Sequence, residues 1–239
     1  MTRPYPEESI QSLFSLQPSW WVPGDLARRS LVWALVPYAE QKPFRLVPVG
    51  RGDDDRQHGR AAYRLEEFRV DGPARRTSTL PVAAMPLHDA EEYMVRRSKK
   101  RPCLILGETS VAVEPALARG KSRWQTSLSR LVVPYYSANG SSSREGWNPE
   151  LVDRIRRGEY PQYFWDHLPL PTAPPGGSIL RLDQTFAIGA DIANIRLTGF
   201  QLHSEALRVL DDWLAWYVTD ELRSDDIRTA RDVLRQPSA

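Results

Sequence analysis

Residues 99–106 read KKRPCLIL, a basic stretch that leads directly into a short apolar run. The run Pro102–Leu106 has the length and composition of a buried strand. A second run of the same character follows at 129–136 (SRLVVPYY) and breaks near Pro134. These two segments predict a β core, entered through a basic turn at 96–101 (RRSKKR) that carries five positive charges in six positions.

Further strands are expected on both sides of this core. Short apolar or alternating runs are typical of strands, and they lie at 30–37, 43–50, 61–70, 111–113, 178–188 and 194–198. Residues 71–90 are expected to form a surface loop. Residues 160–177 hold five prolines and four aromatic side chains, and are expected to form an ordered loop or flap with no regular element.

Helices are predicted in the second half of the chain. Asn148 followed by Pro149 predicts the start of a short helix that Gly158 ends. Ser204 is expected to cap a helix over 205–219, with a broad apolar stripe that includes Trp213 and Trp216. A last helix after 224–226 has Ile227, Ala230 and Leu234 on its inward face.

Composition narrows the class of protein. With 239 residues and 41% hydrophobic side chains, the chain can bury the core of one large domain, and 20 prolines against 14 glycines disfavour a helical bundle. No apolar run reaches the ~18 to 20 residues that span a bilayer, and the N-terminus is not typical of a signal peptide. The single Cys103 gives no disulfide or zinc spacing, so we expect a cytoplasmic protein.

Charge is distributed unevenly along the chain. The formal net charge is +2, but 205–232 holds eight acidic residues and four arginines, a net of −4. The rest of the chain therefore carries +2 − (−4) = +6. A basic β-rich body is where a nucleic acid would bind, although charge runs are commonly only solvated faces.

The segment 178–184 (SILRLDQ) holds the first candidate for chemistry. Residues two apart on a strand share a face, so Arg181 and Asp183 are expected to lie side by side. The pair is either a structural salt bridge or a base with a cationic partner. Arg101 is either a phosphate ligand or part of a solvated turn.

In order and character, these segments resemble the PemK/MazF family of toxin endoribonucleases. The resemblance rests on an opening strand, an Arg-Pro before an apolar strand, a strand ending near Pro-x-Ser, an Arg-x-Asp-Gln, and a turn before a helix. These motifs are 30–37, Arg101-Pro102, 131–137, Arg181 to Gln184, 199–204 and 205–217, and the matching segments that hold them are roughly 24–37, 99–107, 128–137 and 178–218. They cover about a third of the chain, and each motif alone is weak.

The resemblance implies a mainly β fold with C-terminal helices at 205–235. Its core would be a strongly bent SH3-like β-barrel. The chain would be one domain over 1–239, with long insertions at 38–98 and 138–177. Family members cut single-stranded RNA without a metal or cofactor, commonly form homodimers, and are neutralised by an antitoxin protein.

The resemblance also assigns roles to residues. Asp183 would be the general base, Arg181 the acid or phosphate clamp, and Arg101 a stabiliser of transition-state charge. Substrate-binding residues would be Lys99, Lys100, Tyr136, Ser137 and Gln184. Of the tyrosines at 135 and 136, strand alternation leaves only one free to stack on a base.

The chain also departs from the family pattern. Members often carry Glu, or His-Glu, shortly before the Arg-Pro, where this chain has Val95 and Arg96. His88 lies further upstream and could support catalysis only if its loop folds back. The Arg common after Asp-Gln is Phe186. An alternative function is therefore a non-catalytic SH3-like module that binds RNA or a protein, or a toxin-like domain of a larger assembly.

Overall fold

A computed structural model of the chain describes residues 9–14, 20–51, 61–70, 91–108, 111–122, 125–140 and 145–235. It divides the chain into two compact units, residues 36–99 and the remainder. The first expected insertion, 38–98, agrees with the smaller unit to within two residues. The loop expected at 71–90, with His88, and most of the turn at 51–60 lie outside the described residues.

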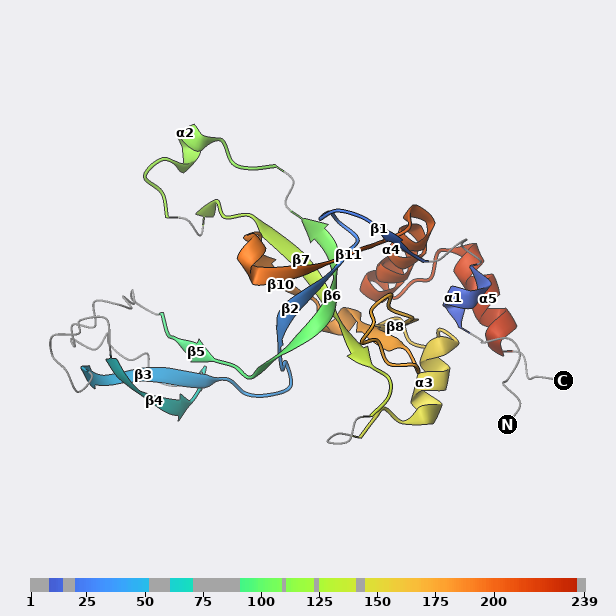
Figure 1. The fold of residues 1–239 in the computed structure, drawn as a ribbon, viewed down its shortest axis with the longest axis horizontal. Helices are drawn as coiled ribbons and strands as arrows, with labels where there is room; N and C mark the ends of the chain where they lie inside the picture. Colours follow the sequence, from blue (N-terminus) through green and yellow to red (C-terminus); the bar gives the residue numbers. More distant parts are fainter. Residues whose placement is uncertain are drawn as a thin grey trace. The chain divides into compact units, whose positions relative to one another are not determined.

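The larger unit is built on an antiparallel sheet of eight strands (Figure 1). The strand order is β1-β11-β2-β6-β7-β9-β8, and β10 also pairs with β7. The bounds are β1 Trp21–Pro23, β2 Ser30–Pro37, β6 Ser98–Glu108, β7 Ser129–Ser137, β8 Tyr163–Asp166, β9 Ser178–Arg181, β10 Phe186–Gly189 and β11 Ile195–Leu202. Within the described residues no pairing of β1 with β8 closes this sheet into a barrel.

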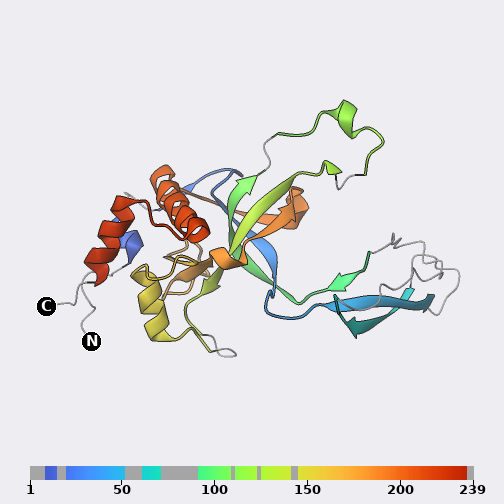
Figure 2. The same ribbon diagram turned by 180° about the vertical axis from the view of Figure 1, so that it is seen from behind.

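Helices and 3-10 turns complete the larger unit. Their bounds are α1 Ile10–Leu13, α2 Pro115–Ala118, α3 Pro149–Arg156, η2 Leu182–Gln184, η3 Ile192–Asn194, α4 Ser204–Thr219 and α5 Asp225–Arg235. The helix α1 lies beside α5 in both ribbon views (Figures 1 and 2). The mainly β fold with C-terminal helices is thus confirmed. No described helix is long and apolar enough to cross a membrane.

The smaller unit is a three-stranded antiparallel sheet with the order β4-β3-β5. Its strands are β3 Phe44–Arg51, β4 Ala61–Glu67 and β5 Met94–Val95. The two longer strands agree with the runs predicted at 43–50 and 61–70. Phe44 and Leu65 remain exposed on this small sheet.

The main core lies between the sheet and the C-terminal helices. Trp213 of α4 is 1% exposed, and its ring makes edge contacts with Phe164 of β8 and with Trp216, each at a centroid distance of 5.2 Å. The predicted inward residues of α5, Ile227, Ala230 and Leu234, are all buried. The apolar stripes of both helices are therefore core, as their spacing predicts.

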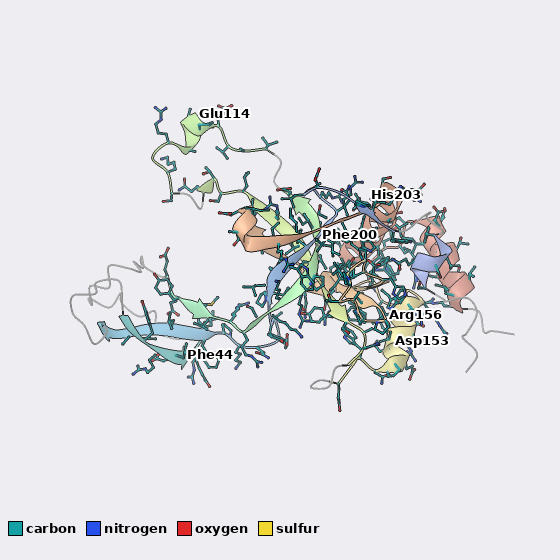
Figure 3. All side chains as sticks on the ribbon, in the orientation of Figure 1. Phe44, Glu114, Asp153, Arg156, Phe200 and His203 are labelled. Carbon is teal, nitrogen blue, oxygen red and sulfur yellow. The ribbon has the colours of Figure 1, made fainter. Side chains whose placement is uncertain are left out.

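Capping explains where the helices begin. The Asn148 side chain accepts hydrogen bonds from the backbone N–H groups of Glu150 and Leu151, as predicted for α3. In α4 the cap is His203, at the N-terminal end of the helix (Figure 3), whose side chain accepts from Glu205 N–H. Ser204 is the first helical residue instead of the cap, so that prediction is one residue off.

Several other expectations are wrong. Residues 98–101 of the expected basic turn already belong to β6, and 111–113 form no strand, while α2 follows a few residues later. The segment 160–177 holds β8, which pairs with β9. The predicted strand 178–188 is interrupted by η2 and divides into β9 and β10.

Candidate functional site

Strand register brings the predicted site residues of three strands together. The pairing of β6 with β7 places Cys103 opposite Pro134, and Arg101 and Tyr136 each lie two residues beyond this pair on their own strands. The guanidinium carbon of Arg101 lies 3.9 Å from the Tyr136 ring centroid. Tyr136 is opposite Ile179 of β9, so Arg181 is its diagonal neighbour, with its guanidinium carbon 5.7 Å from the ring.

Two arginines therefore meet on one tyrosine ring. Tyr136 is 8% exposed and Arg101 is 7% exposed. Arg101 is consequently a buried residue of β6 and not part of a solvated turn, and its role as a phosphate ligand stays a prediction. Cation–π contact with a mostly buried ring contributes to holding both guanidinium groups in place.

Arg181 and Asp183 form a two-pronged ion pair. Nε and Nη2 of Arg181 donate to the two carboxylate oxygens of Asp183 at 2.7 and 2.5 Å. The strand alternation that predicted this pair is not its cause, because β9 ends at Arg181 and Asp183 lies in η2. The turn of η2 brings the carboxylate back toward the guanidinium.

The ion pair keeps the Arg181 guanidinium protonated. The hydrogen bonds to Asp183 raise the pKa of Arg181 above its ordinary value. An arginine is a poor proton donor even without such a partner. Arg181 is therefore suited to hold an anion, and unsuited to act as an acid.

The other four predicted binding residues differ in their placement. The Tyr136 hydroxyl donates to Oε1 of Gln184, which brings Gln184 into the site. Lys100 places its ammonium 5.7 Å from the ring of Trp33, and the Ser137 hydroxyl donates to the Asn139 carbonyl at 2.9 Å. Lys99 is an exposed residue of β6 that belongs to the smaller unit.

The structure adds two aromatic residues to the site. Tyr163 of β8 is directly opposite Arg181, and its ring centroid lies 5.2 Å from the guanidinium carbon. Trp147 lies at 5.7 Å from the same carbon and makes an edge contact with Tyr163 at 5.5 Å. The sequence did not predict these two contacts. Tyr163 lies in a proline-rich segment, and Trp147 follows a segment rich in glycine and serine.

Other candidate residues have structural environments. Tyr135 is 2% exposed, so neither tyrosine of the pair at 135 and 136 is an open stacking surface. Burial raises the pKa of Cys103 to about 12, which makes it an unreactive core residue. Among the described residues, no three His, Cys, Asp or Glu side chains gather as metal ligands would.

A second polar cluster, which sequence reasoning missed, surrounds Asp166. This carboxyl group is 1% exposed. Its Oδ1 accepts from Gln11 Nε2 and from Trp21 Nε1 at 3.3 Å, and its Oδ2 accepts from the Tyr135 hydroxyl at 2.9 Å. Burial outweighs these bonds and raises the pKa of Asp166 from 3.8 to about 6.

This shift makes Asp166 a source of pH-dependent stability. The folded state holds the proton more tightly than the unfolded state, so the stabilising contribution is complete below pH 3.8 and is lost as pH rises through about 6. Two pKa units correspond to about 3 kcal/mol.

The substitution Asp166→Asn is expected to remove this dependence. The amide oxygen can accept from Gln11 and Trp21, and the amide NH2 can donate to the Tyr135 oxygen after its hydroxyl rotates. The difference in free energy of unfolding, variant minus unchanged protein, should increase by about 3 kcal/mol from about pH 4 to about pH 8. The increase arises because only the unchanged protein loses stability as pH rises. Urea unfolding at both pH values measures this difference, and a constant difference would contradict the assignment.

No protein-family model, curated protein or solved structure matches the chain.

Proposed function

We propose that the chain is a toxin-type endoribonuclease that cleaves single-stranded RNA through attack by the ribose 2′-hydroxyl. The observation that supports this most is the meeting of Arg101 and Arg181 on the Tyr136 ring, next to the Asp183 carboxylate. Two cations and one carboxylate are the groups that this reaction needs. In this proposal the eight-stranded sheet of the larger unit corresponds to the SH3-like fold of the PemK/MazF type.

Each residue has a defined part in the proposed reaction. Asp183 accepts the proton of the 2′-hydroxyl, since its two oxygens have lone pairs beyond those that Arg181 uses. The 2′-oxygen bonds to phosphorus and the bond from phosphorus to the 5′-oxygen breaks. Arg101 and Arg181 stabilise the charged phosphorane, and solvent supplies the proton to the leaving 5′-oxygen.

The remaining parts of the proposal follow from the family resemblance. The RNA would be single-stranded, because its 2′-hydroxyl must align with the phosphate. An antitoxin protein would cover the site, two copies of the chain would form a homodimer, and the protein would act in the cytoplasm without a metal. Lys99 and Lys100 would contact the RNA backbone from the beginning of β6.

The test is cleavage of a mixed pool of single-stranded RNA by the purified chain. We expect fragments with a 2′,3′-cyclic phosphate and a 5′-hydroxyl, in the presence or absence of a chelator. The same sequences carrying 2′-O-methyl groups should bind and remain intact, because the nucleophile is blocked. Cleavage of the 2′-O-methyl RNA would overturn the mechanism.

A second candidate is a non-catalytic module that binds RNA or a protein partner with the same face. The engagement of both Asp183 oxygens by Arg181 favours it, because such a pair is also a stable structural element. Binding of RNA without any cleavage product would support this candidate and exclude the nuclease.

A further inference from the structure

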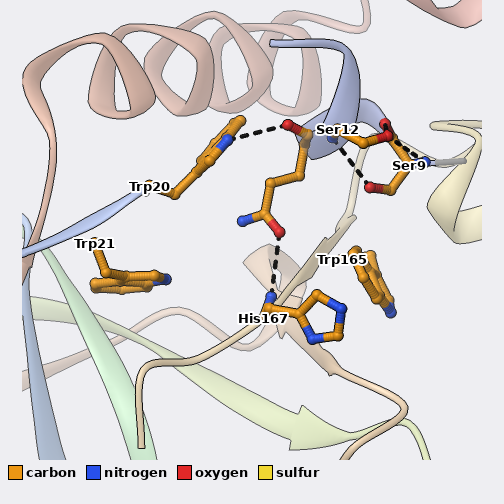
Figure 4. Close-up of a pocket in the computed structure, with 7 residues that line it drawn as sticks. Ser9, Ser12, Trp20, Trp21, Trp165 and His167 are labelled. Atoms are coloured by element: carbon orange, nitrogen blue, oxygen red, sulfur yellow. Dashed lines mark hydrogen bonds between the residues drawn. The ribbon is translucent and has the colours of Figure 1, made fainter. Parts of the chain in front are cut away.

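A pocket separate from the arginine site lies between α1, β1 and the end of β8 (Figure 4). Its volume is about 200 Å³, several times the ~30 Å³ that one water molecule occupies in the liquid. It is lined by Ser9, Gln11, Ser12, Trp20, Trp21, Trp165 and His167. His167 is exposed, so the pocket reaches solvent on that side.

Three indole rings dominate its wall, and each is fixed by its own N–H. Trp20 Nε1 donates to the Gln11 carbonyl at 3.1 Å, and Trp165 Nε1 donates to the Gly176 carbonyl at 3.3 Å. Trp21 Nε1 donates to Asp166. With the N–H groups engaged by the protein, the rings offer their carbon surfaces, which attract cations through their quadrupole.

A buried carboxylate lies directly behind this wall. Gln11 and Trp21, the two donors to Asp166 Oδ1, both line the pocket, and so do its sequence neighbours Trp165 and His167. Asp166 makes no salt bridge within the described part of the chain. A carboxylate without an ion-pair partner in the described part of the chain therefore lies buried beside the aromatic pocket, in contact with two of its lining side chains.

The groups around Asp166 come from several elements. They are the Tyr135 hydroxyl of β7, the Gln11 amide of α1, the Trp21 indole of β1 and the adjacent His167. Arg156 of α3 lies with its guanidinium carbon 5.0 Å from the Trp165 ring. That contact shows that one of the three rings already takes a cation on its surface.

We propose that this pocket binds a small alkylammonium cation, of the quaternary or methylated amine class. Aromatic walls supply the cation–π attraction, and Asp166 supplies the opposite charge from behind the lining side chains Gln11 and Trp21. The carboxylate disfavours an anion, and a neutral apolar molecule would gain nothing from it. The volume of about 200 Å³ accommodates a small free molecule of this class.

The proposal has a definite pH dependence. The cation favours the charged form of Asp166, so affinity should increase as pH rises through about 6.

The test compares choline with its uncharged carbon analogue, 3,3-dimethylbutan-1-ol, by calorimetry and tryptophan fluorescence. We expect saturable choline binding that is at least about tenfold tighter than binding of the analogue. In Asp166→Asn, which is expected to fold, this preference for the charged ligand should disappear. A tryptophan control on β2, outside the pocket, Trp33→Leu, should keep it.

Two results would overturn the proposal. One is equal affinity for choline and the neutral analogue, and the other is choline binding that Asp166→Asn leaves unchanged. Absence of saturation up to about 10 mM choline would also overturn it, since that excludes even millimolar affinity. None of these readouts involves RNA, so the outcome is independent of the proposed nuclease.

Discussion

Replacing Asp183 with asparagine is expected to lower the rate of RNA cleavage by about 100- to 10,000-fold, the range that a general base contributes. Asparagine has nearly the same size and can still accept one hydrogen bond from Arg181, so the site keeps its shape. What it loses is the carboxylate that takes the 2′-hydroxyl proton. Single-turnover cleavage of a defined RNA substrate measures the effect.

Binding and catalysis should separate in this variant. Removing a negative charge beside Arg101 and Arg181 should leave the affinity for 2′-O-methyl RNA equal or increased, because fewer charges repel the phosphates. Expression of the unchanged chain should slow growth, while expression of the Asp183→Asn variant should not.

A matched control for Asp183 exists on α3. Asp153 also pairs with an arginine, Arg157, at 3.1 Å, and it is exposed. The substitution Asp153→Asn should leave cleavage within about threefold, as surface changes of this kind cost little. If Asp183→Asn were equally mild, the role of Asp183 as the base would be wrong.

Replacing Trp213 with alanine is expected to lower the free energy of unfolding by about 3 to 5 kcal/mol, the usual cost of truncating a buried aromatic residue. Trp213 is 1% exposed, and its Nε1 donates to the Pro161 carbonyl at 3.0 Å. Alanine would leave a cavity beside Phe164 and an unsatisfied carbonyl. Urea or guanidinium unfolding followed by far-ultraviolet circular dichroism measures the loss.

The control for Trp213 lies on the same helix. Val218 is 71% exposed, so Val218→Ala should change stability by no more than about 0.5 kcal/mol. A loss below about 1 kcal/mol for Trp213→Ala would contradict the assignment of α4 to the core.

The elements that were predicted correctly are those that a short stretch of sequence determines by itself. The Asn148 cap, the Pro149 that follows it and the apolar spacing of α5 are all readable within one or two helical turns. β7 was predicted within a residue at its end, because a run such as 129–136 has few alternatives to a buried strand.

The failures have non-local causes. β8 has only four residues, and Pro161 and Pro169 flank it without interrupting it. The many prolines around it predicted a loop, but pairing with β9 stabilises a strand here. The predicted neighbours Arg181 and Asp183 do meet, but through the η2 turn. Which residues face Arg101 depends on the register of β6 and β7, and this register is invisible in either segment alone.

The eight-stranded sheet ends in two short strands, β1 with three residues and β8 with four. A free sheet edge offers unpaired backbone groups on which another chain can add a strand, and this is a common route to aggregation. Here each edge offers only a few such groups, and Pro23 in β1 has no N–H to donate. Together with β10, a further four-residue edge that pairs with β7, these short edges leave little backbone for edge-to-edge growth of the sheet into fibres.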